Sequence, residues 1–401
     1  MEERKALKVL MVNTSERTGG AAIAADRLRK ALLRAGVDVD LCVRTRRWGY
    51  LFERLRILWA NGLSTHNLWQ IDIANAGEDI TTTEAFRQAD VIHIHWINQG
   101  FLSLKTLERV LCSGKRIIWT LHDEWPFAGI CHYAGNCPHF QVQCHNCPLL
   151  RHPGKQDLSY RVFMEKRSIY RRATHLTFVG CSKWITNQAR LSNLTQFLEV
   201  VNIANPIDRR IFHPMPQAEA RRRAGLGDEK RRLIFFGCQR VADERKGMKY
   251  LMEALQRLQT NDVALVVAGD SSGLAWAGGP DGRLPVLPVG YVSDEAQMAA
   301  LYASADVFVT PSLEDNLPNT IAEAMSCGTP CVGFRTGGVP EMIGHKRGGY
   351  VAQLRDVEDL SRGIHFVLSH PELRTMAAER ARECYDEDRI VQAYLKLYNE
   401  R

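Results

Sequence analysis

Short apolar runs alternate with longer amphipathic stretches along the chain. The run KVLMVN at 8–13 is typical of a buried strand, and residues 24–36 have apolar positions three and four apart and end on Gly36, which predicts a helix with its C-cap. Further strands of the first half are predicted at 37–43, 90–96, 116–122 and 176–182. Strands that alternate with helices form a parallel sheet covered by helices on both faces.

This alternation stops at 204–216, where ANPIDRRIFHPMP holds three prolines and no regular period, as is typical of a linker. It then restarts, with a helix predicted at 246–258. Strands of the second half are predicted at 232–238, 263–270, 285–292, 305–312 and 329–334.

The predicted fold class is therefore α/β, with two doubly wound Rossmann-like domains. We expect the first domain at 1–206, the second at 207–385, and a C-terminal helix at 386–401 that packs back on the first domain. Ligands of such sheets bind beyond the carboxyl ends of the strands, so the cleft between the domains is the expected active site.

Composition narrows the function classes without choosing one. The 401 residues carry a formal charge of +7, which suits an anionic substrate, a phosphate-rich ligand or an acidic membrane surface, but is small for a nucleic-acid binder. No apolar run approaches the ~20 residues of a membrane span. Eleven cysteines behind an N-terminus without an apolar signal region favour a reducing cytoplasm over a disulfide scaffold.

Two strand-to-helix junctions carry residues suited to phosphate. Gly19 and Gly20 open the first predicted helix, where backbone N–H groups face a ligand, although an ordinary tight turn fits equally well. After the first strand of the second half, GCQRVADERKG places Arg240 and Lys246 on a loop. Two cations there suit a diphosphate, and a solvated charged turn is the alternative.

The stretch TPSLEDNLPNTIAEAMSCGTPCV at 310–332 is unusual because one carboxylate, Glu323, lies in a small, apolar helix. The helix is expected to start near 317–319 with Pro318 in its first turn, so the N–H groups of residues 319–321 form an anion site. A buried, unpaired carboxylate is costly. We expect Glu323 either to reach solvent or to accept hydrogen bonds from ligand hydroxyls, such as a ribose diol.

These segments resemble glycosyltransferase family 4, the retaining nucleotide-sugar transferases of GT-B fold. The resemblance rests on the 310–332 stretch, on GCQRVADERKG, on VGYVSDEAQMAALYASADVFVTPS (289–312), on TLHDEW (120–125) and on ANPIDRRIFHP (204–214). It covers most of the chain and is looser in the first half. The nearest similarity is to the transferases of exopolysaccharide and O-antigen assembly.

The resemblance implies roles for residues of the second half. Glu323 would bind the nucleotide ribose, Arg240 and Lys246 the diphosphate, and Asp315 the donor sugar. The family has a glutamate where this chain has Asp315, and Glu314 is one place out of register, which leaves the donor sugar open. The other residues expected to contact the nucleotide sugar are Gly20, Val292, Asn316, Leu317, Asn319 and Thr320.

In the first half, the resemblance places His122, at the end of a predicted strand, over the donor sugar near its anomeric carbon. His95 is expected to line the acceptor pocket, and His93 to be a satisfied core or surface residue. The implied reaction transfers a sugar to a hydroxyl of a glycan or lipid-linked acceptor with retention. Arg240, Lys246 and helix N–H groups would stabilise the leaving phosphate, so the chemistry requires no cofactor and no divalent cation.

Cysteines cluster in ICHYAGNCPHFQVQCHNCPLL (130–150), at Cys131, Cys137, Cys144 and Cys147. Four thiolates with one Cys-x2-Cys arm can form a closed structural zinc site. Free thiols and disulfides are the alternatives. Similar loops occur in the exopolysaccharide-type transferases, which favours a structural role.

The segment RTRRWGYLFERLRILWANGL (44–63) mixes arginines with large apolar residues at helical spacing. It predicts either a helix that touches an anionic membrane surface, where a lipid-linked acceptor resides, or a helix that covers the sheet with its arginines solvated. The expected location is therefore the cytoplasm, with peripheral contact at the inner face of the plasma membrane as the membrane variant.

Two other function classes stay open at this point. A GT-B-fold sugar-nucleotide epimerase would act on its nucleotide sugar without an acceptor. A zinc-dependent nucleic-acid binder built on the cysteine loop would show steep salt dependence. We expect a transferase, with no nucleic-acid partner.

Overall fold

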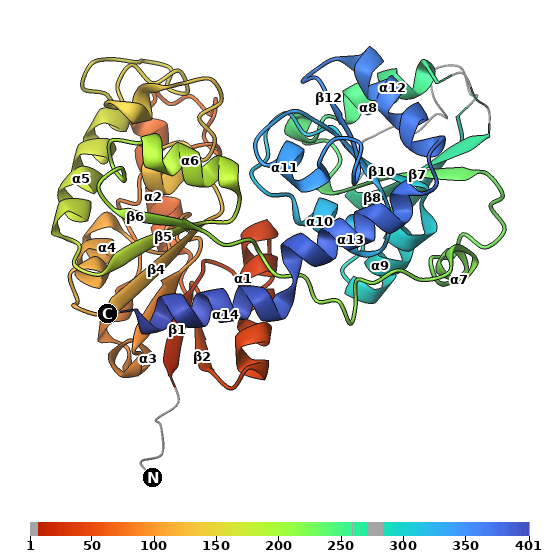
Figure 1. The fold of residues 1–401 in the computed structure, drawn as a ribbon. Helices are drawn as coiled ribbons and strands as arrows, with labels where there is room; N and C mark the ends of the chain where they lie inside the picture. The colour runs from red at the N-terminus through yellow and green to blue at the C-terminus, as the bar shows by residue number, and fades with distance from the viewer. Residues whose placement is uncertain (1–6, 259, 261, 271–283, 401) are drawn as a thin grey trace, which may run out of the picture. The chain divides into compact units, whose positions relative to one another are not determined.

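The computed structural model describes residues 7–258, 260, 262–270 and 284–400 (Figure 1). The chain divides into two compact units, one comprising Met1–Ala204 and Asp388–Arg401 and the other Asn205–Glu387. Each unit is an α/β domain built on a parallel six-stranded sheet, which confirms the predicted fold class.

The sheet of the amino-terminal unit has the order β2-β1-β3-β4-β5-β6. Its helices are α1 (Gly20–Arg34), α2 (Trp48–Ala60), α3 (Glu84–Gln88), α4 (Leu104–Leu111), α5 (Leu158–Arg172), α6 (Lys183–Leu191) and α14 (Glu387–Asn399). Its strands are β1 (Lys8–Val12), β2 (Asp38–Cys42), β3 (Val91–Ile94), β4 (Arg116–Leu121), β5 (Leu176–Gly180) and β6 (Glu199–Asn202). Sequence analysis did not predict β6, because its sequence EVVN holds only two apolar residues between polar ones.

Strand residues of this unit alternate between two apolar layers. Leu10 and Val12 of β1 belong to one core cluster, whereas Val9 and Met11 belong to another that contains residues of α1 and α14. Figure 1 shows α14, in blue, beside β1 and β2. The Tyr398 hydroxyl of α14 is hydrogen-bonded to His93 of β3 at 2.7 Å, so the last helix is part of this unit's core.

The sheet of the carboxyl-terminal unit has the order β12-β11-β10-β7-β8-β9. Its strands are β7 (Arg232–Arg240), β8 (Val263–Asp270), β9 (Val286–Gly290), β10 (Val307–Thr310), β11 (Cys331–Phe334) and β12 (Gly349–Ala352). Its helices are α7 (Gln217–Arg223), α8 (Met248–Gln256), α9 (Glu295–Ser304), α10 (Asn319–Ser326), α11 (Val339–Ile343), α12 (Val357–Leu368) and α13 (Leu373–Tyr385). The short strand β12 was not predicted.

The predicted helix at 246–258 is interrupted at its start. A 3-10 turn, η4 (Glu244–Lys246), precedes Gly247, which has a φ of +72° and separates the turn from α8. A Cβ at Gly247 would lie 1.9 Å from the carbonyl oxygen of Pro311. Only glycine therefore lets the Lys246 turn lie against the loop that follows β10.

Helix α2 departs from the expectation of solvated arginines at one position. Arg54 and its neighbour Glu53 are buried, whereas Arg46, Arg47 and Arg56 are exposed as expected. Trp48, Phe52 and Trp59 are 61–70% exposed, so part of the apolar side of the helix faces outward. None of the helices in the described part of the chain has the length and hydropathy of a membrane-spanning segment.

Candidate functional site

The strand order of the carboxyl-terminal unit reverses between β7 and β10. At such a reversal the loops that follow the two strands diverge to opposite faces and leave a crevice for a ligand. Here the loop after β7 carries Lys246, and the loop after β10 carries Asp315. Two of the residues expected to meet a nucleotide sugar thus flank one switch point.

The Lys246 ammonium donates a hydrogen bond to Oδ2 of Asp315 at 2.7 Å. The two side chains are 28% and 11% exposed, so the pair borders solvent rather than lying in the core. Asp243 holds the turn in place, because its Oδ1 accepts the Arg245 N–H at 3.0 Å. Arg240 is the last residue of β7 and is exposed, so it lies on the strand end and not on the predicted loop.

Helix α10 starts at Asn319, within the expected range 317–319. Pro318 is the residue before the helix rather than part of its first turn. The Ile321 N–H donates to the carbonyl oxygen of Pro318 at 3.0 Å, so it is engaged within the protein. The predicted anion site therefore loses the Ile321 N–H, and contacts of Asn319 and Thr320 with a ligand stay predictions.

The loop before α10 is tightly held. Asn316 is buried, and its carbonyl oxygen accepts the Gly338 N–H at 2.8 Å. Gly337, with a φ of +49°, lets that neighbouring loop come so close that a Cβ would lie 1.8 Å from the Asp315 carbonyl oxygen. Leu317 lies in the loop after β10 and Val292 follows the edge strand β9, and their contacts with a ligand stay predictions.

Glu323 neither reaches solvent nor lacks a partner in the protein. Its side chain belongs to a residue that is 7% exposed, and its Oε2 accepts the Tyr302 hydroxyl at 2.8 Å. Tyr302 comes from α9 and is fully buried. Sequence reasoning missed Tyr302, although a lone phenol among the small and apolar residues of 299–304 was an available signal.

Glu314 and Asp315 have different surroundings. Burial raises the pKa of Glu314, against the charges of Arg245 and Arg355. The carboxylate that meets Lys246 belongs to Asp315, not to Glu314. The assignment of Asp315 to the donor sugar stays a prediction.

The amino-terminal unit has its own switch point between β1 and β3. The Trp96 N–H donates to Oδ1 of Asn13 at 3.0 Å, and the Thr14 hydroxyl donates to the Asn98 carbonyl at 3.0 Å. Gly20 is the first residue of α1 and follows Gly19, whose φ is +93°. A contact between Gly20 and a ligand stays a prediction.

His122 follows β4 and is paired with another histidine. Its Nε2 lies 2.9 Å from Nδ1 of His95, and the rings stack. Burial lowers the pKa of His122 to about 4 and keeps the pKa of His95 well below its usual range. Both rings are therefore neutral near pH 7, and because one must donate to the other, their tautomers are coupled.

His93 is a core residue, as one of the two expectations had it. It is fully buried, and its ring nitrogens are hydrogen-bonded to Tyr398 at 2.7 Å and to Thr120 at 2.8 Å. Its ring stacks on His95 with centroids 4.3 Å apart. The neutral ring of His93, fixed by its two hydrogen bonds, thus packs against His95 and supports the His95–His122 pair.

Asp123, next to His122, ends a buried ionic chain that sequence reasoning missed. His132 bridges two carboxylates, with Nδ1 2.7 Å from Asp123 and Nε2 2.7 Å from Asp72. Burial acts to lower the pKa of His132, but these carboxylates raise it to about 10, so the ring is a cation at neutral pH. Arg54 of α2 pairs with the other oxygen of Asp72. No spacing in the sequence links these four positions.

The cysteine loop is anchored by a buried lysine. The Lys166 ammonium donates to the carbonyl oxygens of Trp125, Ala128 and Gly129 at 2.6, 3.1 and 2.9 Å, and it lies 3.3 Å from the centre of the Trp125 ring. Burial lowers the pKa of Lys166 to about 7. The lysine therefore fixes the backbone between His122 and Cys131, directly before the cysteine loop.

The structure does not support the expected zinc site. Cys131, Cys137, Cys144 and Cys147 are free thiols, which also leaves the disulfide alternative without support. Within the residues that the structure describes, no group of three His, Cys, Asp or Glu side chains has a metal-binding arrangement. Burial raises the pKa of Cys144 to about 12 and of Cys147 to about 11, so both are neutral packing residues.

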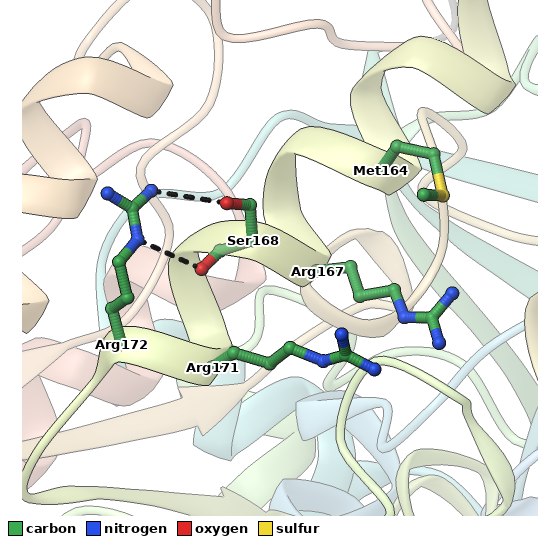
Figure 2. Close-up of a pocket in the computed structure, with 5 residues that line it drawn as sticks. All are labelled: Met164, Arg167, Ser168, Arg171 and Arg172. Atoms are coloured by element: carbon green, nitrogen blue, oxygen red, sulfur yellow. Dashed lines mark hydrogen bonds between the residues drawn. The ribbon is translucent and has the colours of Figure 1, made fainter.

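A shallow hollow on α5 carries several cations but none of the predicted site residues. Figure 2 shows the guanidinium groups of Arg167 and Arg171 extending from the helix, while Arg172 donates to the Ser168 carbonyl at 3.2 Å. These arginines follow one another on a single exposed helix face. The hollow is therefore not a candidate for the reaction.

Both halves of the chain match known families. Residues 18–191 match the family described as Glycosyltransferase Family 4, and residues 230–370 match the family described as Glycosyl transferases group 1. The second match contains Arg240, Lys246, Asp315 and Glu323, and the first contains Gly20 and His122.

Two curated relatives are similar over different lengths. WcaC of Escherichia coli K12, named for glycosyl transfer in colanic acid biosynthesis, is 24% identical over 77% of this chain and 76% of its own length. The N,N'-diacetylbacillosaminyl-diphospho-undecaprenol alpha-1,3-N-acetylgalactosaminyltransferase of Campylobacter jejuni is 33% identical over 28% of this chain and 30% of its own length.

Solved structures share the fold over nearly the whole chain. Sucrose-phosphate synthase from Thermosynechococcus elongatus matches with a TM-score of 0.69 and 17% identity, covering 98% of both chains. Anabaena Alr3699/HepE in complex with UDP and glucose matches with a TM-score of 0.64 and 16% identity, covering 98% of this chain and 100% of its own. These likenesses establish the GT-B fold.

Proposed function

We propose, since this chain belongs to glycosyltransferase family 4, that it moves a sugar from a nucleotide-diphosphate sugar to a hydroxyl of a glycan or lipid-linked acceptor, with retention at the anomeric carbon. The pathway is the biosynthesis of a cell-surface polysaccharide. The observation that carries the proposal is the Lys246–Asp315 pair at the switch point of the carboxyl-terminal sheet, in a segment whose family match also contains Glu323.

The donor's diphosphate would be bound by Lys246, Arg240 and the backbone of Asn319 and Thr320. Lys246 is half-buried and held by Asp315, and Arg240 is exposed at the strand end, so both cations are at a surface that a ligand can reach. Charge develops on the leaving phosphate during transfer, and two fixed cations stabilise it. In this scheme no divalent cation is required.

Glu323 would accept hydrogen bonds from the ribose hydroxyls. Its carboxylate is oriented by the Tyr302 hydroxyl at 2.8 Å, which fixes the plane in which further donors can approach. Asp315 would contact hydroxyls of the donor sugar, and His122 would contact the same sugar as a neutral ring. His95 would set the tautomer of His122 and therefore which of its nitrogens carries the proton.

The relatives support the donor and acceptor classes. The Anabaena structure contains UDP and glucose, which favours a nucleotide-sugar donor. The name of the Campylobacter relative includes an undecaprenol diphosphate, which favours a lipid-linked acceptor and a place at the inner face of the plasma membrane. Neither the comparisons nor the site adds support for the epimerase or nucleic-acid alternatives.

A thermal-shift screen of nucleotide sugars tests donor binding. At least one should raise the melting temperature of the wild-type chain, because a ligand that binds only the folded state stabilises it. Glu323→Ala should abolish the shift, whereas the control Glu314→Gln should retain it. If no nucleotide sugar stabilises the wild type, donor binding is wrong.

A further inference from the structure

Helix α2 presents five large apolar side chains to solvent. Each lies three or four residues from another member along the helix, so together they form one continuous stripe. We call this surface the apolar stripe, and its members are Trp48, Leu51, Phe52, Leu55 and Trp59, which are 49–70% exposed. In a soluble domain such a face normally packs on the core.

The opposite face of α2 explains why the stripe points outward. Oε1 of Glu53 accepts the backbone N–H groups of Ile73 at 2.9 Å and Ala74 at 2.6 Å. Arg54 donates to the Ile71 carbonyl at 3.0 Å and pairs with Asp72. Rotating the helix to bury the stripe would break these contacts and separate Arg54 from the buried carboxylate of Asp72. The outward orientation is therefore built into the fold.

Two more exposed apolar side chains follow the helix along the chain. Leu63 and Trp69 are 72% and 64% exposed, and Trp69 stacks on Tyr50 of α2 with ring centroids 6.2 Å apart. A cluster of this kind on one segment differs from the scattered single apolar residues of an ordinary surface. It is the signature of an interaction surface.

Cations surround the stripe. Arg46, Arg47 and Arg56 are exposed, and the Arg56 guanidinium lies 5.4 Å from the centre of the Trp59 ring. The only acidic residue of 44–63 is Glu53, which is buried. Nearby Glu78 is occupied by the backbone N–H groups of Thr45 and Arg46, at 2.8 and 2.7 Å. Apolar and aromatic side chains between arginines match the boundary between the headgroups and acyl chains of an anionic bilayer.

We propose that the apolar stripe docks the chain on an anionic lipid bilayer, with α2 lying in the plane of the interface. A second copy of this chain is a poorer partner, because self-association of the stripe would bring the arginines of both copies together without carboxylates to pair them. The inference rests on α2 alone and does not depend on the proposed sugar transfer.

The test uses the full chain with two kinds of vesicle, one of phosphatidylcholine and one of phosphatidylcholine mixed with phosphatidylglycerol. Co-sedimentation should be strong only with the anionic vesicles and should weaken as salt is added. Tryptophan emission should shift to the blue on binding, because Trp48 and Trp59 leave water.

The triple variant Leu51→Ser, Phe52→Ser, Leu55→Ser should bind anionic vesicles at least about tenfold more weakly. All three side chains are exposed, so the variant should keep the melting temperature of the wild type. The matched control is Leu191→Ser with Phe197→Ser, which removes exposed apolar residues of the same unit away from α2 and should bind like the wild type.

Three results would overturn the proposal: no binding of the wild type to anionic vesicles, equal loss in the triple variant and the control, or a wild-type dimer in solution that the triple variant converts to monomer. Stabilisation of the triple variant by a nucleotide sugar is measured in parallel. Because the stripe is separate from Lys246 and Glu323, a failure of vesicle binding and a failure of donor binding are distinguishable.

Discussion

In the carboxyl-terminal unit, the lysine and the carboxylate that meet at the strand ends stay partly exposed to solvent. In the amino-terminal unit, by contrast, the loops after β3 and β4 rest on ionised groups that are almost completely buried. A ligand can replace either partner of the Lys246–Asp315 ion pair at little desolvation cost. His132, Asp72 and Asp123 cannot, because separating them would leave buried charges without partners. The first arrangement suits a binding site, and the second suits a rigid support.

The difference predicts that Lys246→Ala affects catalysis most. Loss of a fixed cation beside the leaving phosphate should lower kcat/KM about 10²–10³-fold, the range found when one transition-state donor is removed. Stability should change little, because Lys246 is partly exposed. Steady-state kinetics with the donor found in the thermal-shift screen measures the effect.

The matched control is Lys249→Ala, which removes an exposed lysine from the same segment of chain. Its kcat/KM should stay within about twofold of the wild type, as for most surface substitutions. Equal losses in both variants would mean that general surface charge, and not Lys246, acts on the donor.

The buried support predicts the reverse pattern for His132→Ala. Removing the imidazolium takes from the buried carboxylates of Asp72 and Asp123 the cation that they share, which should reduce the free energy of unfolding by about 3–5 kcal/mol. Denaturant unfolding measures this loss. His66→Ala, at an exposed position, should be neutral, and a similarly neutral His132→Ala would refute the role of the ionic chain.

Asp315 and its neighbour Glu314 allow the effect of the carboxylate that pairs with Lys246 to be compared with that of a nearby carboxylate that does not. Asp315→Asn removes the charge that pairs with Lys246 and should lower kcat/KM about 10-fold or more, the effect of losing about 1.4 kcal/mol. Glu314→Gln removes a charge that does not contact Lys246 and should change it by about twofold or less. The order of the two effects would reverse if Glu314 were the carboxylate that meets the donor sugar.

The buried histidines of the amino-terminal unit should make the stability of the protein depend on pH. Burial depresses the pKa of His122 to about 4 and of His93 to about 3, so these rings stay neutral in the folded state while their unfolded counterparts gain protons below about pH 6.5. Their contribution is therefore present above pH 6.5 and is lost as the pH falls toward 4.

Urea unfolding between pH 7 and pH 4 measures this loss. It should be on the order of 6 kcal/mol, because each of the two rings loses about 1.4 kcal/mol per pH unit below 6.5, and His122→Asn should make it smaller, because one of the depressed groups is removed. The opposite sign applies to His132, whose raised pKa of about 10 means that its contribution fades as the pH rises above 6.5. A wild type whose stability stays constant down to pH 4 would contradict the neutral, buried histidines.

The comparison also explains what the sequence could predict. The sites of the carboxyl-terminal unit lie in two contiguous segments, 237–247 and 310–332, so their residue types and spacing are visible along the chain. The ionic chain of the other unit joins Arg54, Asp72, Asp123 and His132 from separate segments, and no local pattern connects them. Tyr302 was missed for the same reason, because its partner Glu323 lies in another helix.

Helix α2 shows a second limit of pattern analysis. Helical spacing within 44–63 predicted α2, which spans Trp48–Ala60. It did not decide which face is buried, because that depends on partners such as Asp72 and the backbone of Ile73 and Ala74. Arg54 was expected to be solvated because charged side chains normally face water, but it is buried because its charge has a buried partner.

The central claim is retaining sugar transfer from a nucleotide-sugar donor, and the anomeric configuration of the product tests it most directly. The donor that stabilises the chain is incubated with a lipid-linked or glycan acceptor, and proton NMR follows the new glycosidic bond from the earliest time points. The account predicts a first-formed product with the anomeric configuration of the donor, formed about 10²–10³-fold more slowly by Lys246→Ala. A first-formed product of opposite configuration would contradict it.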